Sequence, residues 1–174
     1  MKKQQPSFQA SAELDASKEL AWKALSQMNQ WLLQLDSVES IRVLGFNNTE
    51  ASAADADTNS AANKQEFFVE GRRYSIKTSE GVSMKAKISK IDPQKHELII
   101  DAHIGPLRSH LMCSIKDGDN NKSVLLVSVQ EYSGLFGKMF AQAKAEREAK
   151  EVQDYLAAWK AWTQKLALEE STTT

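Results

Sequence analysis

The chain has 174 residues, of which 41% are hydrophobic and 26% charged, and its formal net charge is -1 at pH 7. This composition is typical of a folded globular domain, and it excludes a long disordered chain or a fibrous repeat. A near-neutral charge provides no general attraction to nucleic acid or anionic membranes, so we expect neither as a partner. The length predicts one domain over residues 1–174, and the sequence leaves its oligomeric state open.

The N-terminus and the cysteine count restrict the location and the chemistry. The opening MKKQQPSF has no apolar run after its two lysines, and no stretch approaches the roughly 18 apolar residues that cross a bilayer. We therefore expect a cytoplasmic protein without an integral membrane segment. Cys113 is the only cysteine, which excludes an internal disulfide and a multi-cysteine zinc site. We expect no metal and no cofactor, and we favour a buried apolar role for Cys113 over a reactive thiol.

The first third of the chain predicts a strand, two short helices and a second strand. Residues 7–14 alternate apolar and polar side chains, residues 15–28 have apolar side chains at helical spacing, and residues 29–37 resemble a second helix. Residues 38–46 form the next predicted strand. Residues 47–64 contain no apolar side chain other than alanine, so we expect a mobile polar loop, either a tolerated insertion or a lid.

The middle of the chain predicts an antiparallel meander. Alternating apolar residues separated by short turns predict consecutive strands. These strands lie within residues 66–78, 82–91, 96–104, 109–116 and 123–132. Each of them needs apolar cover on one face only.

The last predicted element is a helix of about thirty residues that starts at Ser133 as its cap and covers the sheet, followed by a disordered tail at residues 169–174. Its C-terminal half has one bulky apolar stripe, formed by Val152, Tyr155, Leu156, Trp159, Trp162 and Leu166. Farther toward the N-terminus the same stripe contains Glu148, Ala145 and Ala141, which are small or charged. Either the sheet approaches the helix closely there and Glu148 reaches solvent, or these residues line a cavity for an apolar ligand.

This order of elements resembles the helix-grip fold of the START, birch-pollen-allergen and polyketide-cyclase superfamily (SRPBCC). The resemblance covers nearly the whole chain, and its most specific pieces are ASAELDASKELAWKAL, EGRRYSIKT, KISKIDPQKHELII, and VQEYSGLFGKMF leading into YLAAWKAWTQKL. It implies an α+β domain in which a strongly curved antiparallel sheet of six to seven strands wraps a long C-terminal helix, with two short helices after the first strand. It also implies a cavity between sheet and helix, used in the superfamily for lipids, sterols, quinones, polyketides or aromatic hormones.

The inward faces of the predicted elements provide the candidate ligand-binding residues. We expect the cavity to be lined by Tyr74, Ile76, Met84, Ile88, Ile100, Leu111, Cys113, Leu125, Val127, Ala141, Ala145, Glu148 and Val152. The function that this predicts is the binding or carrying of a hydrophobic small molecule. The alternative is an enzyme that acts on an aromatic or polyketide-like substrate, with Glu148 and Tyr74 as proton-transfer groups. The chain contains no glycine-rich phosphate loop, HExxH motif or GxSxG motif, and we assign no catalytic residue.

Two histidines and the cysteine lie close together in AHIGPLRSHLMCSI, residues 102–115. If residues 105–108 form a four-residue turn, His103 is opposite His110, and Ile100 is opposite Cys113. Both histidines then face outward while Cys113 faces the interior. This arrangement disfavours a Cys/His dyad, although a one-residue change in the turn would reverse the faces and restore it.

Overall fold

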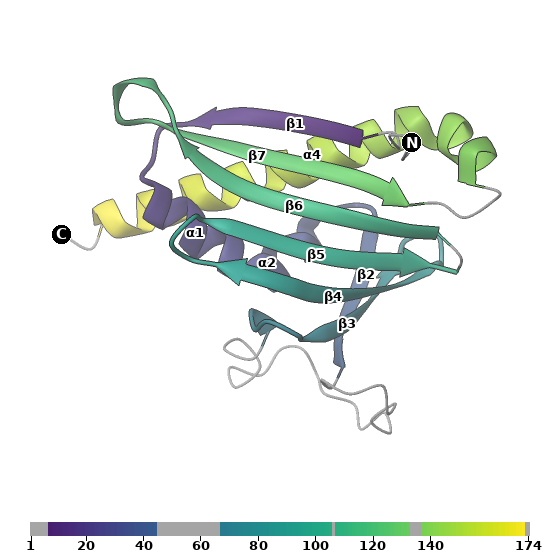
Figure 1. Cartoon of the computed structure of the whole chain (residues 1–174). Helices are drawn as coiled ribbons and strands as arrows, with labels where there is room; N and C mark the ends of the chain where they lie inside the picture. Colours follow the sequence, from purple (N-terminus) through teal and green to yellow (C-terminus); the bar gives the residue numbers. More distant parts are fainter. Residues whose placement is uncertain (1–6, 45–66, 106, 133–136, 173–174) are drawn as a thin grey trace.

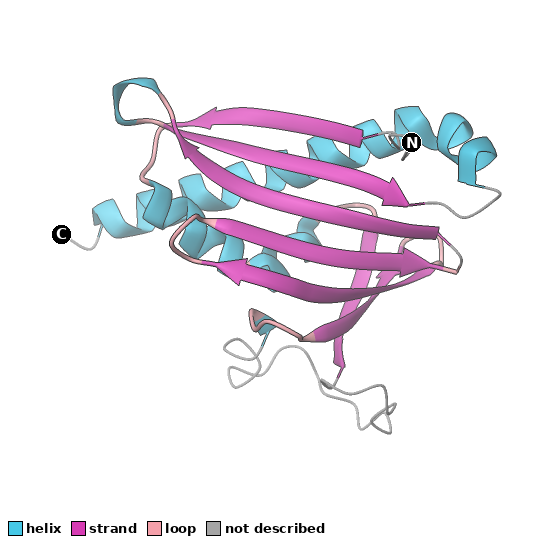
Figure 2. Ribbon diagram, in the orientation of Figure 1, coloured by secondary structure: helices cyan, strands magenta, loops and turns pink. Residues whose placement is uncertain are grey.

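The computed structural model describes residues 7–44, 67–105, 107–132 and 137–172, and for residues 7, 107, 121, 131–132 and 137–145 it describes the backbone only. Figures 1 and 2 show one curved sheet with the helices on one side of it. In chain order the elements are β1 Ser7–Leu14, α1 Lys18–Ser26, α2 Met28–Trp31, the 3-10 turn η1 Leu32–Gln34, β2 Val38–Leu44, β3 Arg73–Thr78, β4 Ser83–Asp92, β5 Glu97–Ile104, β6 Leu107–Asp117, the 3-10 turn η3 Asp119–Asn121, β7 Ser123–Tyr132 and α4 Gly137–Thr172.

The sheet has seven strands in the order β1-β7-β6-β5-β4-β3-β2, and all neighbours are antiparallel. Together with α1, α2 and the 36-residue α4, this confirms the predicted helix-grip architecture. The predicted cap Ser133 and the predicted polar loop at residues 47–64 lie outside the described residues. The tail expected at residues 169–174 is helical as far as Thr172, because Ala, Leu and Glu in LALEE sustain the helix.

Buried tryptophans attach the helices to one another. Trp159 Nε1 of α4 donates to the backbone oxygen of Ala21 in α1 at 2.9 Å, and Trp31 Nε1 donates to the backbone oxygen of Ala24 at 2.8 Å. Both indoles are fully buried, so each N–H has a partner where water cannot provide one. The predicted bulky stripe of α4 is buried throughout, from Val152 to Leu166. The helix is thereby held at its C-terminal half.

The β5–β6 hairpin differs from the predicted register by two residues. Ile104 pairs with Leu107, so residues 105 and 106 alone connect the strands, and Gly105 has a φ of 53°. Positive φ values are typical of tight two-residue hairpins, which match the twist of the strands. Asp101 is therefore opposite His110, and Leu98 is opposite Cys113.

Each side chain of the hairpin lies on its predicted face of the sheet in spite of this shift in register. A shift of two residues keeps the parity of a strand, whereas a shift of one would exchange its faces. Cys113 is fully buried, His103 is exposed, and His110 lies with Asp101 on the outer face. The predicted separation of the cysteine from the histidines is therefore confirmed, although the predicted His103–His110 pairing is wrong.

Candidate functional site

A row of small residues crosses the inner face of the sheet. The small residues are Ala86, Ala102 and Ser109, which pair in this order across strands β4, β5 and β6. On β3 the residue paired with Ala86 is Tyr74. The neighbouring row has Ile100 paired with Leu111, which are much larger. Since Ala and Ser leave unfilled the volume that large side chains would occupy, the sheet has a depression along this row.

A pocket of about 340 Å³ lies over this depression, between the sheet and α4. Apolar side chains provide most of its wall, with a few polar ones at its edge, which is the usual composition of a small-molecule site. From α2, η1 and the chain that follows, the lining residues are Met28, Leu32, Leu35, Ser37 and Val38. From the β3–β4 region to β7 they are Tyr74, Ile76, Thr78, Glu80, Val82, Met84, Ala86, Ile100, Ala102, Ile104, Ser109, Leu111 and Val129.

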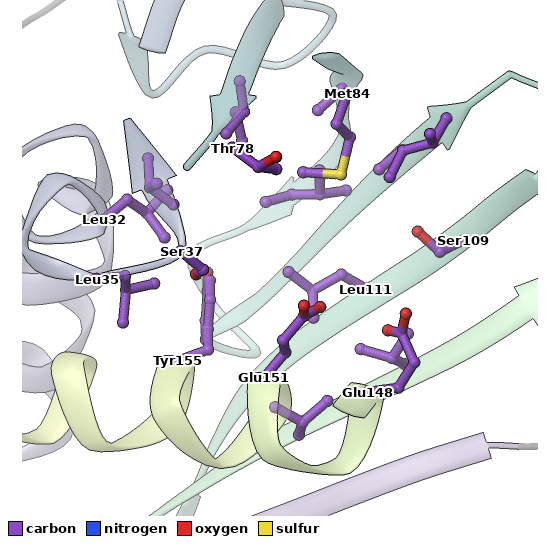
Figure 3. A pocket seen from close by; sticks show the side chains of 18 of the residues that line it. Leu32, Leu35, Ser37, Thr78, Met84, Ser109, Leu111, Glu148, Glu151 and Tyr155 are labelled. Carbon is purple, nitrogen blue, oxygen red and sulfur yellow. The ribbon is translucent and has the colours of Figure 1, made fainter. Parts of the chain in front are cut away.

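Helix α4 closes the pocket with Arg147, Glu148, Glu151, Val152 and Tyr155. Figure 3 shows Glu148, Glu151 and Tyr155 rising from α4 toward the strands, with Leu111 behind them. At helical spacing these side chains share one face of α4. The pocket thus lies where the bulky apolar stripe ends at Val152 and charged residues begin.

The predicted cavity residues divide into three groups. Those that line the pocket are Tyr74, Ile76, Met84, Ile100, Leu111, Glu148 and Val152. Those that are fully buried in the core and do not line it are Ile88, Cys113, Leu125 and Val127. Those whose side chains lie outside the described part are Ala141 and Ala145. In this second group Cys113 lies behind Tyr155, whose Oη is 3.6 Å from Cys113 Sγ and which itself contributes to the pocket wall.

Sequence reasoning missed two parts of the pocket. It did not assign Ser109, which completes the row of small residues with Ala86 and Ala102. It also missed the contribution of Met28, Leu32 and Leu35, because no pattern in the sequence indicates that the short second helix packs near β3 and α4.

Two phenols of the wall and the thiol of Cys113 behind it form a buried polar group. Tyr74 is 1% exposed, and its hydroxyl has no hydrogen-bond partner. Burial raises the pKa of the Tyr74 phenol well above its ordinary value, and the nearby Cys113 adds to the effect. Cys113 Sγ donates to Tyr155 Oη at 3.6 Å, and burial raises the pKa of Cys113 to about 12. All three groups are therefore uncharged at neutral pH.

Ion pairs occupy the rim. Arg147 Nη2 of α4 lies 2.8 Å from Glu80 Oε2 in the β3–β4 turn, and Arg147 Nε lies 3.0 Å from Glu151 Oε1. Hydrogen bonds from Arg147 to Glu80 and Glu151 raise the pKa of the guanidinium. The contact with Glu80 joins the helix to the sheet beside the pocket. Its partners are 47% and 56% exposed, so it is accessible to water.

A second polar cluster lies on the opposite face of the sheet. Ser89 Oγ donates to Asp101, and His110 Nδ1 lies 2.6 Å from Asp101 Oδ1. The carboxylate is in the centre, whereas serine nucleophile chemistry requires the histidine between serine and aspartate. Within the described residues no group of three or more His, Cys, Asp or Glu side chains is arranged to hold a metal ion. No helix in the described residues is both long and apolar enough to cross a membrane.

No protein-family model matches the chain, and no curated protein matches it. Solved structures do match it in fold. Norcoclaurine synthase from Thalictrum flavum is 13% identical with a TM-score of 0.66, and the match covers 94% of this chain and 87% of that one. A hypothetical protein from Helicobacter pylori is 13% identical with a TM-score of 0.65, covering 93% and 90%. Ara h 8.0201 is 13% identical with a TM-score of 0.62, covering 92% and 98%.

These similarities define a structural class. The chain has the birch-pollen-allergen-like helix-grip fold, with the curved sheet wrapped on the C-terminal helix. At 13% identity the likeness concerns the fold, and activity has to be argued from the site itself.

Proposed function

We propose that the protein binds a hydrophobic small molecule in the pocket between β3–β6 and α4. The observation that carries the proposal is the pocket of about 340 Å³ with its mainly apolar wall. Pockets that hold small ligands have volumes from about 300 Å³ upward and a few placed polar groups. The finer classes of lipid, quinone, polyketide and aromatic compound all remain within this proposal.

Binding of a solvatochromic naphthalene dye tests it. Ala102 lies on the pocket floor and is 9% exposed, so Ala102→Phe would fill the space in which the dye binds. The matched control is Ala161→Phe, because Ala161 is exposed on α4 and does not line the pocket. We expect saturable, blue-shifted dye fluorescence in the wild type and the control, and loss of most of it in Ala102→Phe.

A second pocket-filling variant is needed because Ala102→Phe could lose dye binding through misfolding. Overpacking a buried site costs about 1–3 kcal/mol, so the thermal unfolding of Ala102→Phe is measured beside its dye binding. Ser109→Trp places bulk at a half-buried pocket position instead, where the added ring has more room. Dye binding that persists in both folded variants contradicts the proposed function.

An enzyme in the same pocket is the second candidate. It is supported by Glu148 and Tyr74, which both line the pocket and can exchange or donate protons. Mass spectrometry of reactions with a panel of aromatic and polyketide-like compounds tests it. Product formed by the wild type and not by Glu148→Gln supports this candidate, and equal turnover by both removes Glu148 from it.

A further inference from the structure

The charged residues of the pocket all lie on two elements, the β3–β4 turn and α4. Among the described lining residues they are Glu80, Arg147, Glu148 and Glu151, which amount to three carboxylates and one guanidinium. The described part of the rim is therefore net acidic. A charged group on a bound ligand would lie within a few ångströms of these side chains, where Coulomb interactions are weakly screened.

Arg147, the one cation among the described rim residues, is already engaged. Arg147 contacts Glu80 at 2.8 Å and Glu151 at 3.0 Å, so its guanidinium is shared by two carboxylates. A ligand carboxylate would have to displace one of them and would leave that glutamate without its counterion. The site therefore opposes an anionic ligand, although it contains an arginine.

The inner wall is polar without being charged. Burial keeps Tyr74 and Tyr155, the two phenols of this wall, protonated. The Tyr74 hydroxyl, on a residue that lines the pocket, is buried without a hydrogen-bond partner. Such a group is costly in an empty protein, and a polar atom of a ligand would offset that cost. A charged end of the ligand, by contrast, is accommodated only at the rim.

We propose that the ligand is a hydrophobic amine, bound with its apolar body over Ala86 and Ala102 and its ammonium group at the acidic rim beside Glu148 and Glu151. This rests on the proposed function, since it names the chemical class that the same pocket selects. Ion pairs at a partly exposed rim are individually weak. Two of them acting together correspond to about a tenfold preference over the matching acid.

Three probes with one hydrophobic body test the preference. 1-Naphthylmethylamine, 1-naphthylmethanol and 1-naphthylacetic acid share the naphthylmethyl body and carry an ammonium, a hydroxyl and a carboxylate group, respectively, at pH 7. Their dissociation constants are measured on the full chain by displacement of the naphthalene dye, at low and high salt. We expect the amine to bind about tenfold more tightly than the acid, with the alcohol between them, and the difference to shrink in high salt.

Charge-neutral variants assign the preference to residues. In Glu148→Gln combined with Glu151→Gln, the amine should lose about tenfold in affinity while the alcohol is unchanged. Glu146→Gln is the matched control, because Glu146 is exposed on the same helix and does not line the pocket. Arg147→Gln should have the opposite effect, tightening the amine and weakening the acid, since it frees Glu80 and Glu151.

The outcomes separate the two proposals. If all three probes bind equally, or the acid binds best, the amine proposal is overturned and the hydrophobic pocket stands. If Arg147→Gln abolishes binding of the acid alone, the arginine is an anion receptor and the amine proposal is again overturned. If the dye binds saturably in the pocket and only the amine displaces it well, both proposals are supported. If neither the dye nor any probe binds, the proposed function itself fails.

Discussion

The indole Nε1 of Trp159 donates a hydrogen bond to the backbone oxygen of Ala21, 2.9 Å away, across 138 positions of the sequence. Trp162 adds a bond of 2.8 Å from its Nε1 to Gln27 Oε1, just beyond the end of α1. These bonds fix the C-terminal half of α4 against α1, while its more N-terminal residues Arg147, Glu148 and Glu151 line the pocket. The anchored half and the ligand-facing half of α4 are therefore adjacent but distinct.

Removing the Trp159 bond should destabilise the whole domain. Trp159→Phe deletes a buried hydrogen bond and leaves both a small void and an unsatisfied Ala21 oxygen. We expect the free energy of unfolding to fall by about 2 kcal/mol, measured by urea denaturation. Trp22→Phe is the control, because the Trp22 side chain is only partly buried and packs edge-on to Phe68 and His96. An equal effect in both variants would contradict the role of the Trp159 bond.

Tyr74 and Tyr155 should respond differently to loss of their hydroxyls. Tyr74→Phe removes a buried hydroxyl that has no partner, so we expect the free energy of unfolding to stay constant or rise by about 1 kcal/mol. Tyr155→Phe removes the acceptor of the Cys113 thiol and should lower stability instead. Thermal unfolding of the two variants compares them directly. A clear loss of stability in Tyr74→Phe would show that its hydroxyl has a partner in solution.

The Cys113 thiol should be inert in the folded protein. Burial raises its pKa to about 12, which leaves almost no thiolate at pH 8, and the thiolate is the reactive species. We expect a disulfide-exchange reagent to modify Cys113 only as fast as the protein opens, and at once in denaturant. Rapid modification under native conditions would mean that the thiol is accessible.

Acid should weaken the Asp101 cluster on the outer face. Burial tends to raise the pKa of Asp101, but hydrogen bonds from Ser89 and His110 outweigh it and hold the pKa below 3.8. Because the folded pKa is the lower one, this carboxylate stabilises the protein above about pH 4, and the contribution is lost as the pH falls through the folded pKa.

The corresponding experiment compares Asp101→Asn with the wild type between pH 2.5 and pH 7. The variant should be less stable at pH 7, and the difference should vanish at the acid end. Asp15→Asn, at an exposed position, is the control for the removal of one carboxylate. A difference between variant and wild type that stays constant over the whole range would exclude the linkage to Asp101.

Much of the fold was predictable because it depends on local patterns. Alternation in the strands and helical spacing in α4 define which face of each element is apolar. The β5–β6 turn is two residues shorter than expected, and an even shift in register leaves Cys113 and His110 on their predicted faces. Turn length depends on backbone twist at Gly105, which composition does not reveal.

The sequence by itself determined the order of elements, the bulky stripe from Val152 to Leu166 and the placement of Glu148 at the end of that stripe. Only the tertiary structure decided where the pocket lies. Ala86, Ala102 and Ser109 come from three strands, and their alignment depends on register across the sheet. Glu80 and Arg147 are 67 positions apart, and their contact exists only because α4 crosses the β3–β4 turn. A cavity is volume that many distant residues leave unfilled, so no local pattern can encode it.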